Sequence, residues 1–185
     1  MIQSITSQRL TAITILALSA MAIEGCKGKH SQQPAVKNEE AQPVAQILSS
    51  FKMGDEAAQA QLLKGFYVVE NNSWRWTAGS FTVLLKPPMA SAQKGGTLTL
   101  SFSVADIVIK KLKTVTLTAS IGTTKLKPQT YSQAGSATYT VDVPADLLAK
   151  ETVTIDFELD HSLPPGSVDL RELGLIATAV GLEPK

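Results

Sequence analysis

The sequence predicts an all-β fold, an antiparallel β-sandwich that follows a polar N-terminal region. Hydrophobic and polar residues alternate with a period of two in several runs, and turn-forming residues separate these runs at regular intervals. The chain has one cysteine, so no internal disulfide forms and the fold depends on an apolar core. We therefore expect roughly eight or nine short strands in a single domain.

The N-terminal segment is typical of a bacterial lipoprotein signal peptide. Arg9 gives a basic start, and Leu10–Ile23 is an apolar or small run without basic or acidic residues. This run is shorter than the roughly 20 apolar residues of a membrane span. It ends at Cys26 in a sequence similar to a lipobox, from which Glu24 departs. We expect residues 1–25 to be the signal peptide and Cys26 to carry the lipid. The alternatives are a free thiol after an ordinary secretory signal and a buried internal cysteine.

Residues 26–50 have the composition of a flexible tether. They are rich in Gln, Lys, Glu and Pro and have no sustained apolar period. A lipid on Cys26 would hold the exported chain on a membrane through this tether. Lys27 stands where some bacteria place an aspartate to retain a lipoprotein in the inner membrane. The outer membrane is therefore favoured if the organism is Gram-negative.

The remaining residues, 51–185, are predicted to form the sandwich. A short helix is expected between Phe51 and Gly65, with Asp55 as its N-cap, and a helical turn is expected in Pro144–Lys150. The alternating runs predict half-buried strands at Leu98–Val104, Val115–Ile121, Tyr139–Val143 and Val153–Leu159. Shorter strands are expected at Phe66–Glu70, Trp74–Thr77, Phe81–Lys86, Ile107–Ile109, Lys125–Lys127 and Leu173–Leu182.

Three ordered stretches resemble a bacterial galactose-binding-like jelly-roll domain. They are Gly65–Glu70 with Trp74–Thr77, the strand–turn–strand region Val115–Val143, and Leu163–Leu175. Such domains occur alone or beside glycosyltransferases and cell-envelope polysaccharide proteins. The resemblance covers roughly residues 65 to 183, and it implies a jelly roll with a glycan or polysaccharide ligand. Sandwich architecture does not fix function, since related jelly rolls also bind peptides or lipids.

The first candidate site contains Glu70, Trp74, Arg75 and Trp76. On a strand, Trp74 and Trp76 point to one face and Arg75 points to the other. In one interpretation a tryptophan lies in the core and Arg75 pairs with Glu70. In the other, one ring is a platform for a sugar, and Glu70 and Arg75 supply polar contacts.

The second candidate is the run Asp169-Leu170-Arg171-Glu172-Leu173-Gly174. Asp169 and Arg171 share a side-chain direction in an extended chain, so an ion pair between them would hold a loop shut. Gly174 would permit a bend or a close backbone approach. We favour a structural clamp formed by Asp169, Arg171 and Gly174 over a ligand clamp.

Composition disfavours several classes of function. A formal net charge of +1 leaves no field that would attract nucleic acid. Two histidines do not make a histidine-rich metal cluster, so no metal and no cofactor are expected. Asp160-His161-Ser162 has the residue types of a hydrolase, but contiguous residues do not converge on one point. The basic cluster at Lys110–Lys113 is expected at a strand end, exposed to solvent.

The sequence therefore predicts a lipid-anchored, non-catalytic binding protein of the cell envelope. A glycan or polysaccharide is the expected ligand class. The alternative is a structural or protein–protein module that contacts an envelope protein and binds no sugar. An unrecognised hydrolase has the least support.

Overall fold

The computed structural model describes residues 46–166 and 169–185. The predicted signal peptide, Cys26 and the tether up to residue 45 lie outside these described residues. The described part consists mainly of antiparallel strands in two layers, so the predicted antiparallel β-sandwich is confirmed. None of the helices in the described residues is long and apolar enough to cross a membrane.

The described residues form ten strands and four short helical segments. The strands are β1 (Ser50–Lys52), β2 (Leu62–Phe66), β3 (Arg75–Leu85), β4 (Gly96–Val104), β5 (Val115–Ile121), β6 (Thr124–Lys125), β7 (Gln129–Tyr131), β8 (Gly135–Val143), β9 (Val153–Leu159) and β10 (Ile176–Pro184). The helical segments are η1 (Glu56–Gln61), α1 (Ser91–Lys94), α2 (Asp106–Leu112) and η2 (Ala145–Leu148), of which η1 and η2 are 3₁₀ helices.

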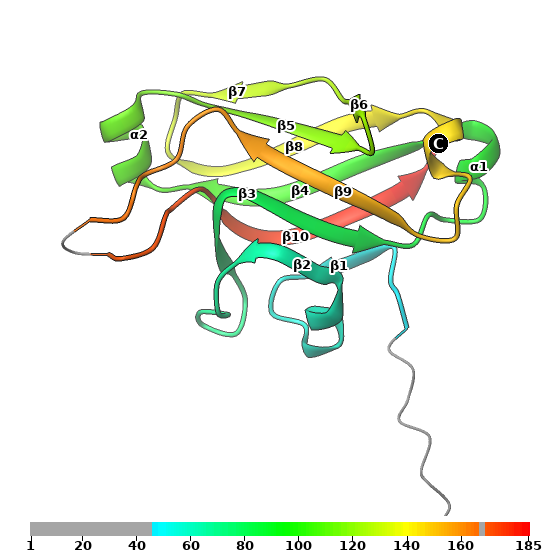
Figure 1. The fold of residues 1–185 in the computed structure, drawn as a ribbon, viewed down its shortest axis with the longest axis horizontal. Coiled ribbons are helices and arrows are strands. Elements are labelled where there is room, and N and C mark those ends of the chain that lie inside the picture. Colours follow the sequence, from blue (N-terminus) through cyan, green and yellow to red (C-terminus); the bar gives the residue numbers. More distant parts are fainter. Residues whose placement is uncertain (1–45, 167–168) are drawn as a thin grey trace, which may run out of the picture. The chain divides into compact units, whose positions relative to one another are not determined.

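The strand order is that of a jelly roll. One sheet has the order β1-β10-β4-β8, and the other has the order β2-β3-β9-β5, with β6 and β7 pairing with β5. The longer strands from β3 onward alternate between the two sheets along the chain, which is how a jelly roll is wound. At its start β3 also pairs with β10, through Trp76 and Ile176, so the sheets join at this corner. Figure 1 shows α1 and the C-terminus at one end of the sandwich and α2 at the other.

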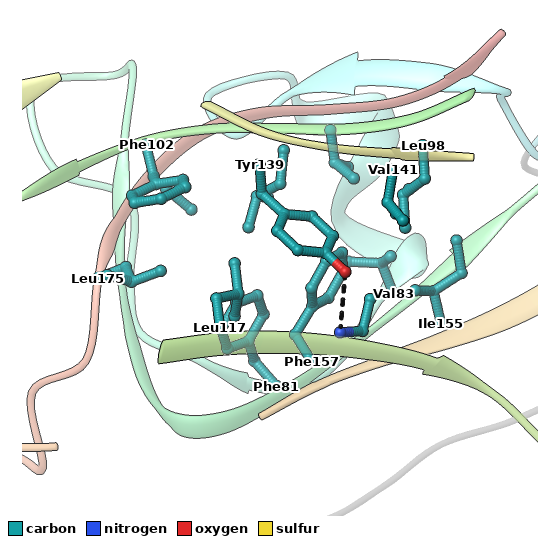
Figure 2. Close-up of a cluster of buried hydrophobic side chains, with 14 of the residues drawn as sticks. Phe81, Val83, Leu98, Phe102, Leu117, Tyr139, Val141, Ile155, Phe157 and Leu175 are labelled. Atoms are coloured by element: carbon teal, nitrogen blue, oxygen red, sulfur yellow. Dashed lines mark hydrogen bonds between the residues drawn. The ribbon is translucent and has the colours of Figure 1, made fainter. Parts of the chain in front are cut away.

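The core lies between the two sheets and is formed by the inward-facing residues of the alternating strands. Leu98, Leu100, Phe102 and Val104 of β4 are all buried, as the period of two predicts. Figure 2 shows large side chains from both sheets meeting there. Phe81 of β3 stacks on Phe157 of β9 with ring centroids 4.9 Å apart. All of the core residues lie between residues 51 and 182.

Tyr139 of β8 places a hydroxyl group in this core. The hydroxyl accepts a hydrogen bond from the Ala119 N–H at 3.3 Å, drawn as a dashed line in Figure 2. It donates another to the Lys127 carbonyl at 2.8 Å. These partners lie where the pairing of β5 is interrupted between β6 and β7, next to Pro128, which has no N–H. The hydroxyl therefore satisfies two backbone groups that the ladder leaves unpaired, and burial raises the pKa of Tyr139.

The outer edge of β8 is covered by side chains from β7. The Gln129 side-chain amide donates to the Thr140 carbonyl at 2.6 Å, and the Tyr131 hydroxyl donates to the Thr138 carbonyl at 3.1 Å. Within the described part of the chain, β8 is the last strand of its sheet and pairs only with β4. Two of its edge carbonyls are thus occupied within the domain.

Several strand predictions are wrong. Of the strand expected at Phe66–Glu70, only Phe66 lies in a strand, β2, which begins earlier, at Leu62. Ile107–Ile109 belongs to the helix α2, and the basic cluster at Lys110–Lys113 lies in and just after its last turn rather than at a strand end. Asp106 in the first turn and Lys110 in the last turn both interact favourably with the helix dipole. The strands expected at Trp74–Thr77 and Phe81–Lys86 are instead one strand, β3.

The helix expected after Phe51 is the short segment η1, and its ends differ from the prediction. Asp55 occupies the N-cap position, but its carboxylate accepts a hydrogen bond from the Lys52 N–H at 2.9 Å and none from the helix. Gly65 lies inside β2 with φ of +75° rather than at the helix end. A Cβ there would lie 2.0 Å from the Ser80 carbonyl oxygen, so the close approach of β2 to β3 requires glycine.

Candidate functional site

Two regions hold the polar residues that are candidates for function. The first, here called the loop end, consists of residues 67–74 and, from a second segment, residues 160–166 and 169–175, beside the start of β3. The second is the outer face of the sheet formed by β1, β10 and β4. In Figure 1 the loop end lies on the side of α2, away from α1 and the C-terminus.

Arg171 joins the two segments of the loop end. Its guanidinium makes a two-point contact with Asp169, with N–O distances of 3.0 and 2.9 Å, and binds the Glu70 carboxylate at 2.9 Å. The same group lies 5.3 Å from the ring centre of Tyr67. Hydrogen bonds from Arg171 hold the pKa of Asp169 below its ordinary value, and the two carboxylates raise the pKa of Arg171.

Gly174 holds the second segment against β3. Its N–H donates to the Thr77 carbonyl at 2.7 Å, and the Leu175 N–H donates to the Thr77 side chain at 3.0 Å. A Cβ on Gly174 would lie 2.5 Å from the Ala78 carbonyl oxygen. The backbones could not approach this closely with any larger residue at position 174. Asp169, Arg171 and Gly174 thus contact neighbouring parts of the chain, and we interpret them as a clamp that fixes the loop end.

Arg75 does not pair with Glu70, so this part of the first interpretation is wrong. Its side chain is 7% exposed and donates to the Met53 carbonyl, the Tyr67 carbonyl and the Gln59 side chain at 2.8, 3.1 and 2.8 Å. Burial lowers the pKa of Arg75. All three partners are neutral. Met53 and Gln59 precede β2 and Tyr67 follows it, so Arg75 connects the segments on both sides of β2 to the start of β3. We assign it to the framework of the domain.

The two tryptophans lie beside this buried arginine. Trp76 is half-buried and packs against the core. Trp74 is also half-buried, does not belong to the core cluster, and forms a bridge with Glu70 at the turn before β3. Among the four residues of the first candidate site, Trp74 is the one that packs neither with the core nor in a polar contact of its side chain within the described residues.

The side chains of Asp160, His161 and Ser162 do not form a triad. Asp160 accepts a hydrogen bond from the Thr116 N–H at 2.7 Å, whereas the Ser162 hydroxyl donates to the Glu172 carboxylate. These hydrogen bonds help to hold the loop end in place, in addition to those of Arg171. Across residues 46–166 and 169–185, no group of three or more His, Cys, Asp or Glu is placed to hold a metal ion.

The outer face of the β1-β10-β4 sheet carries a groove that sequence reasoning missed. Its volume is about 410 Å³. It is lined by Ser50, Phe51, Lys52, Asp55, Thr99, Ser101, Ala179, Val180, Gly181 and Glu183. Phe51 and Val180 are buried core residues, so the exposed lining is formed by hydroxyl, charged and very small side chains.

The register of the three strands explains the groove. Gly181 of β10 lies between Ser50 of β1 and Thr99 of β4, and Ala179 lies between Lys52 and Ser101. The small residues of β10 therefore form a low floor between two rows of taller polar side chains. The alternation of β4 predicts exposed threonines, but only the register between distant strands places them beside Lys52, so no local sequence signal could reveal the groove.

Comparisons with known proteins leave the family of this chain open. Neither a protein-family model nor a curated protein matches it. One similar solved structure is described as "CBM4 structure and function". The two are 17% identical over 74% of this chain and 85% of that chain, with a TM-score of 0.33. A likeness this weak assigns neither a ligand nor an activity to this chain.

Proposed function

We propose that this chain is a non-catalytic binding protein of the cell envelope that binds a polysaccharide in the groove on the β1-β10-β4 sheet. The lining of that groove carries the proposal. Ser50, Thr99 and Ser101 offer hydroxyl groups that donate and accept hydrogen bonds. The lining also carries one positive charge, on Lys52, and two negative charges, on Asp55 and Glu183. A polymer of hydroxylated rings presents the complementary donors and acceptors along its whole length.

The shape of the groove favours an extended ligand over a small enclosed one. It lies open on the outer face of a sheet, and its floor consists of Ala179 and Gly181. An extended chain could therefore lie along this open face. The exposed lining contains no aromatic ring, since Phe51 is buried, so hydrogen bonds rather than stacking would give the affinity.

The second part of the proposal is the location. The apolar run before Cys26 and the tether that follows it support an exported chain that is held on a membrane by a lipid. Labelling with a fatty-acid analogue tests this part. The wild-type chain should carry the label and Cys26→Ser should not, whereas equal labelling of both would overturn the anchor.

A second function is favoured by a different observation. At the loop end Val68 is 75% exposed and Leu170 is 84% exposed, next to the residues that Arg171 brings together. Exposed aliphatic side chains beside a fixed ion pair are suited to contact with another protein. The alternative is therefore an interaction module that binds an envelope protein through its loop end.

Polysaccharide binding by residues 27–185 tests the groove. This piece lacks only the predicted signal peptide and Cys26, and it retains every core residue. Affinity electrophoresis against a panel of soluble and cell-wall polysaccharides should retard the chain. Thr99→Lys places a long side chain in the groove and should weaken binding by about tenfold, which corresponds to about 1.4 kcal/mol.

The matched control is Thr154→Lys. Thr154 is an exposed threonine on β9, in the opposite sheet, so this exchange adds the same charge outside the groove. Binding that Thr99→Lys weakens and Thr154→Lys retains supports the groove. Binding lost only in Trp74→Ala would move the site to the loop end. A folded chain that binds no polysaccharide would favour the protein-partner alternative.

A further inference from the structure

The end of the sandwich opposite the loop end carries an exposed apolar tip. Lys86-Pro87-Pro88-Met89 follows β3, and Met89 is 100% exposed. The two prolines restrict the backbone that presents this methionine. An unbranched, flexible apolar side chain at such a tip is suited to insertion into a soft apolar surface.

The chain enters the domain directly beside this tip. The Lys86 N–H donates to the Leu48 carbonyl at 3.0 Å. Residues 46–49 and 86–89 line one shallow hollow of about 240 Å³, which contains Ile47, Leu48 and both prolines. Any tether that reaches the domain through residue 46 therefore ends at the apolar tip.

β3 separates this end from the loop end. It runs from Arg75, beside the loop end, to Leu85, immediately before the tip, and has 11 residues. Its ten residue steps of about 3.3 Å set an upper limit of about 33 Å on the separation of its two ends. Figure 1 shows β3 running along the length of the sandwich, from the side of α2 to the side of α1.

We propose that the tip formed by Lys86, Pro87, Pro88 and Met89 rests on the bilayer that holds the lipid anchor, with Met89 at the headgroup–acyl boundary. This inference rests on the proposed lipid anchor at Cys26. The flexible tether that the sequence predicts for residues 26–45 would have an r.m.s. span of about 25 Å. Because this tether joins the domain beside the tip, the tip lies closer to the lipid than the loop end does.

Lys86 and Lys94 flank Met89 on either side along the chain, and both are exposed. Neither forms an ion pair with a described residue. Lysines that are free to meet lipid phosphates would favour this orientation on an anionic bilayer.

Site-specific fluorescence in vesicles tests the contact. The full chain is expressed with its signal peptide, purified from membranes as Met89→Cys, and labelled with an environment-sensitive dye, since a lipidated Cys26 has no free thiol. It is then reconstituted into phosphatidylethanolamine–phosphatidylglycerol vesicles that contain a nitroxide-labelled lipid. Leu170→Cys is the matched control, because Leu170 is also an exposed apolar residue but lies at the loop end.

We expect the dye at position 89 to emit at shorter wavelength and to be quenched at least fivefold more strongly than the dye at position 170. Equal or weaker quenching at position 89, in a chain that carries the fatty-acid label and floats with the vesicles, would overturn the tip contact alone. A chain without fatty-acid label that does not float would overturn the anchor, and the tip contact with it. Flotation and quenching thus separate the two failures.

Discussion

Two arginines organise two regions of this domain in different ways. Arg75 is buried and donates only to neutral groups, two backbone carbonyls and one side-chain amide. Arg171 is 31% exposed and binds two carboxylates. Of the partners of Arg75, Met53 is fully buried, whereas Tyr67 and Gln59 keep some contact with water, as the partners of Arg171 do.

This difference predicts which arginine matters more for stability. A buried carbonyl that loses its donor cannot turn to water, so its full desolvation cost appears in the free energy of unfolding. A half-exposed carboxylate that loses its arginine is rehydrated at little cost. Substitution of Arg75 should therefore lower the free energy of unfolding more than substitution of Arg171 does.

Arg75→Met gives the largest expected effect. The buried Met53 carbonyl loses its donor at a cost of about 1–3 kcal/mol, and the Tyr67 carbonyl and the Gln59 side chain, which water can reach, lose less. We therefore expect a loss of about 2–4 kcal/mol in urea unfolding of residues 27–185. A loss below about 1 kcal/mol would show that the substituted domain lets water reach the Met53 carbonyl.

Gly174→Ala should cause the second-largest loss in the free energy of unfolding. Its Cβ would lie 2.5 Å from the Ala78 carbonyl oxygen and 2.8 Å from the Thr77 hydroxyl, so backbone atoms must move. We expect a loss of about 1–3 kcal/mol, measured by urea unfolding. Gly166→Ala is the matched control in the same loop, since a Cβ there meets nothing within 4 Å. Equal losses in the two variants would contradict the close approach.

Arg171→Met should cost less than either. Its ion pairs with Glu70 and Asp169 are about one-third exposed and screened by water, so we expect about 1 kcal/mol and a smaller difference at high salt. Lys86→Met, which removes an exposed lysine from the opposite end, is the control. A loss as large as that of Arg75→Met would remove the contrast between the two arginines.

The smallest effect is a dependence on pH. Asp169 has a lowered pKa in the folded chain, so its contribution is present above its unfolded pKa of about 4 and is lost as the pH falls through the folded value. The difference in unfolding free energy between wild type and Asp169→Asn should therefore be constant near neutrality and shrink below about pH 4. A difference that grows on acidification would contradict the pairing with Arg171.

Much of the fold could be predicted because its signal is local. In a strand such as β4, the alternation of apolar and polar residues indicates which face is buried. The contact between Asp169 and Arg171 is also local, two positions apart. The helix α2 was missed because Ile107, Val108 and Ile109 favour strands as isolated residues, although tertiary context makes this segment helical.

The polar contacts of the site depend on distant segments and could not be predicted. Arg75 finds its partners at positions 53, 59 and 67, two of them backbone carbonyls that carry no side-chain signature. Arg171 pairs with Glu70, which lies 101 positions away in the sequence. Proximity in the sequence favoured Arg75 as the partner of Glu70 instead. The groove likewise requires the register of β1, β10 and β4 together.

The covered edge of β8 has a consequence for molecules held at high density. An open edge strand of nine residues could accept the edge of a second copy, and growth by such additions yields filaments. Gln129 and Tyr131 already occupy the carbonyls of Thr140 and Thr138, so an incoming strand must first displace two intramolecular donors. Copies confined to a surface, where collisions are frequent and alike in orientation, would therefore remain separate molecules.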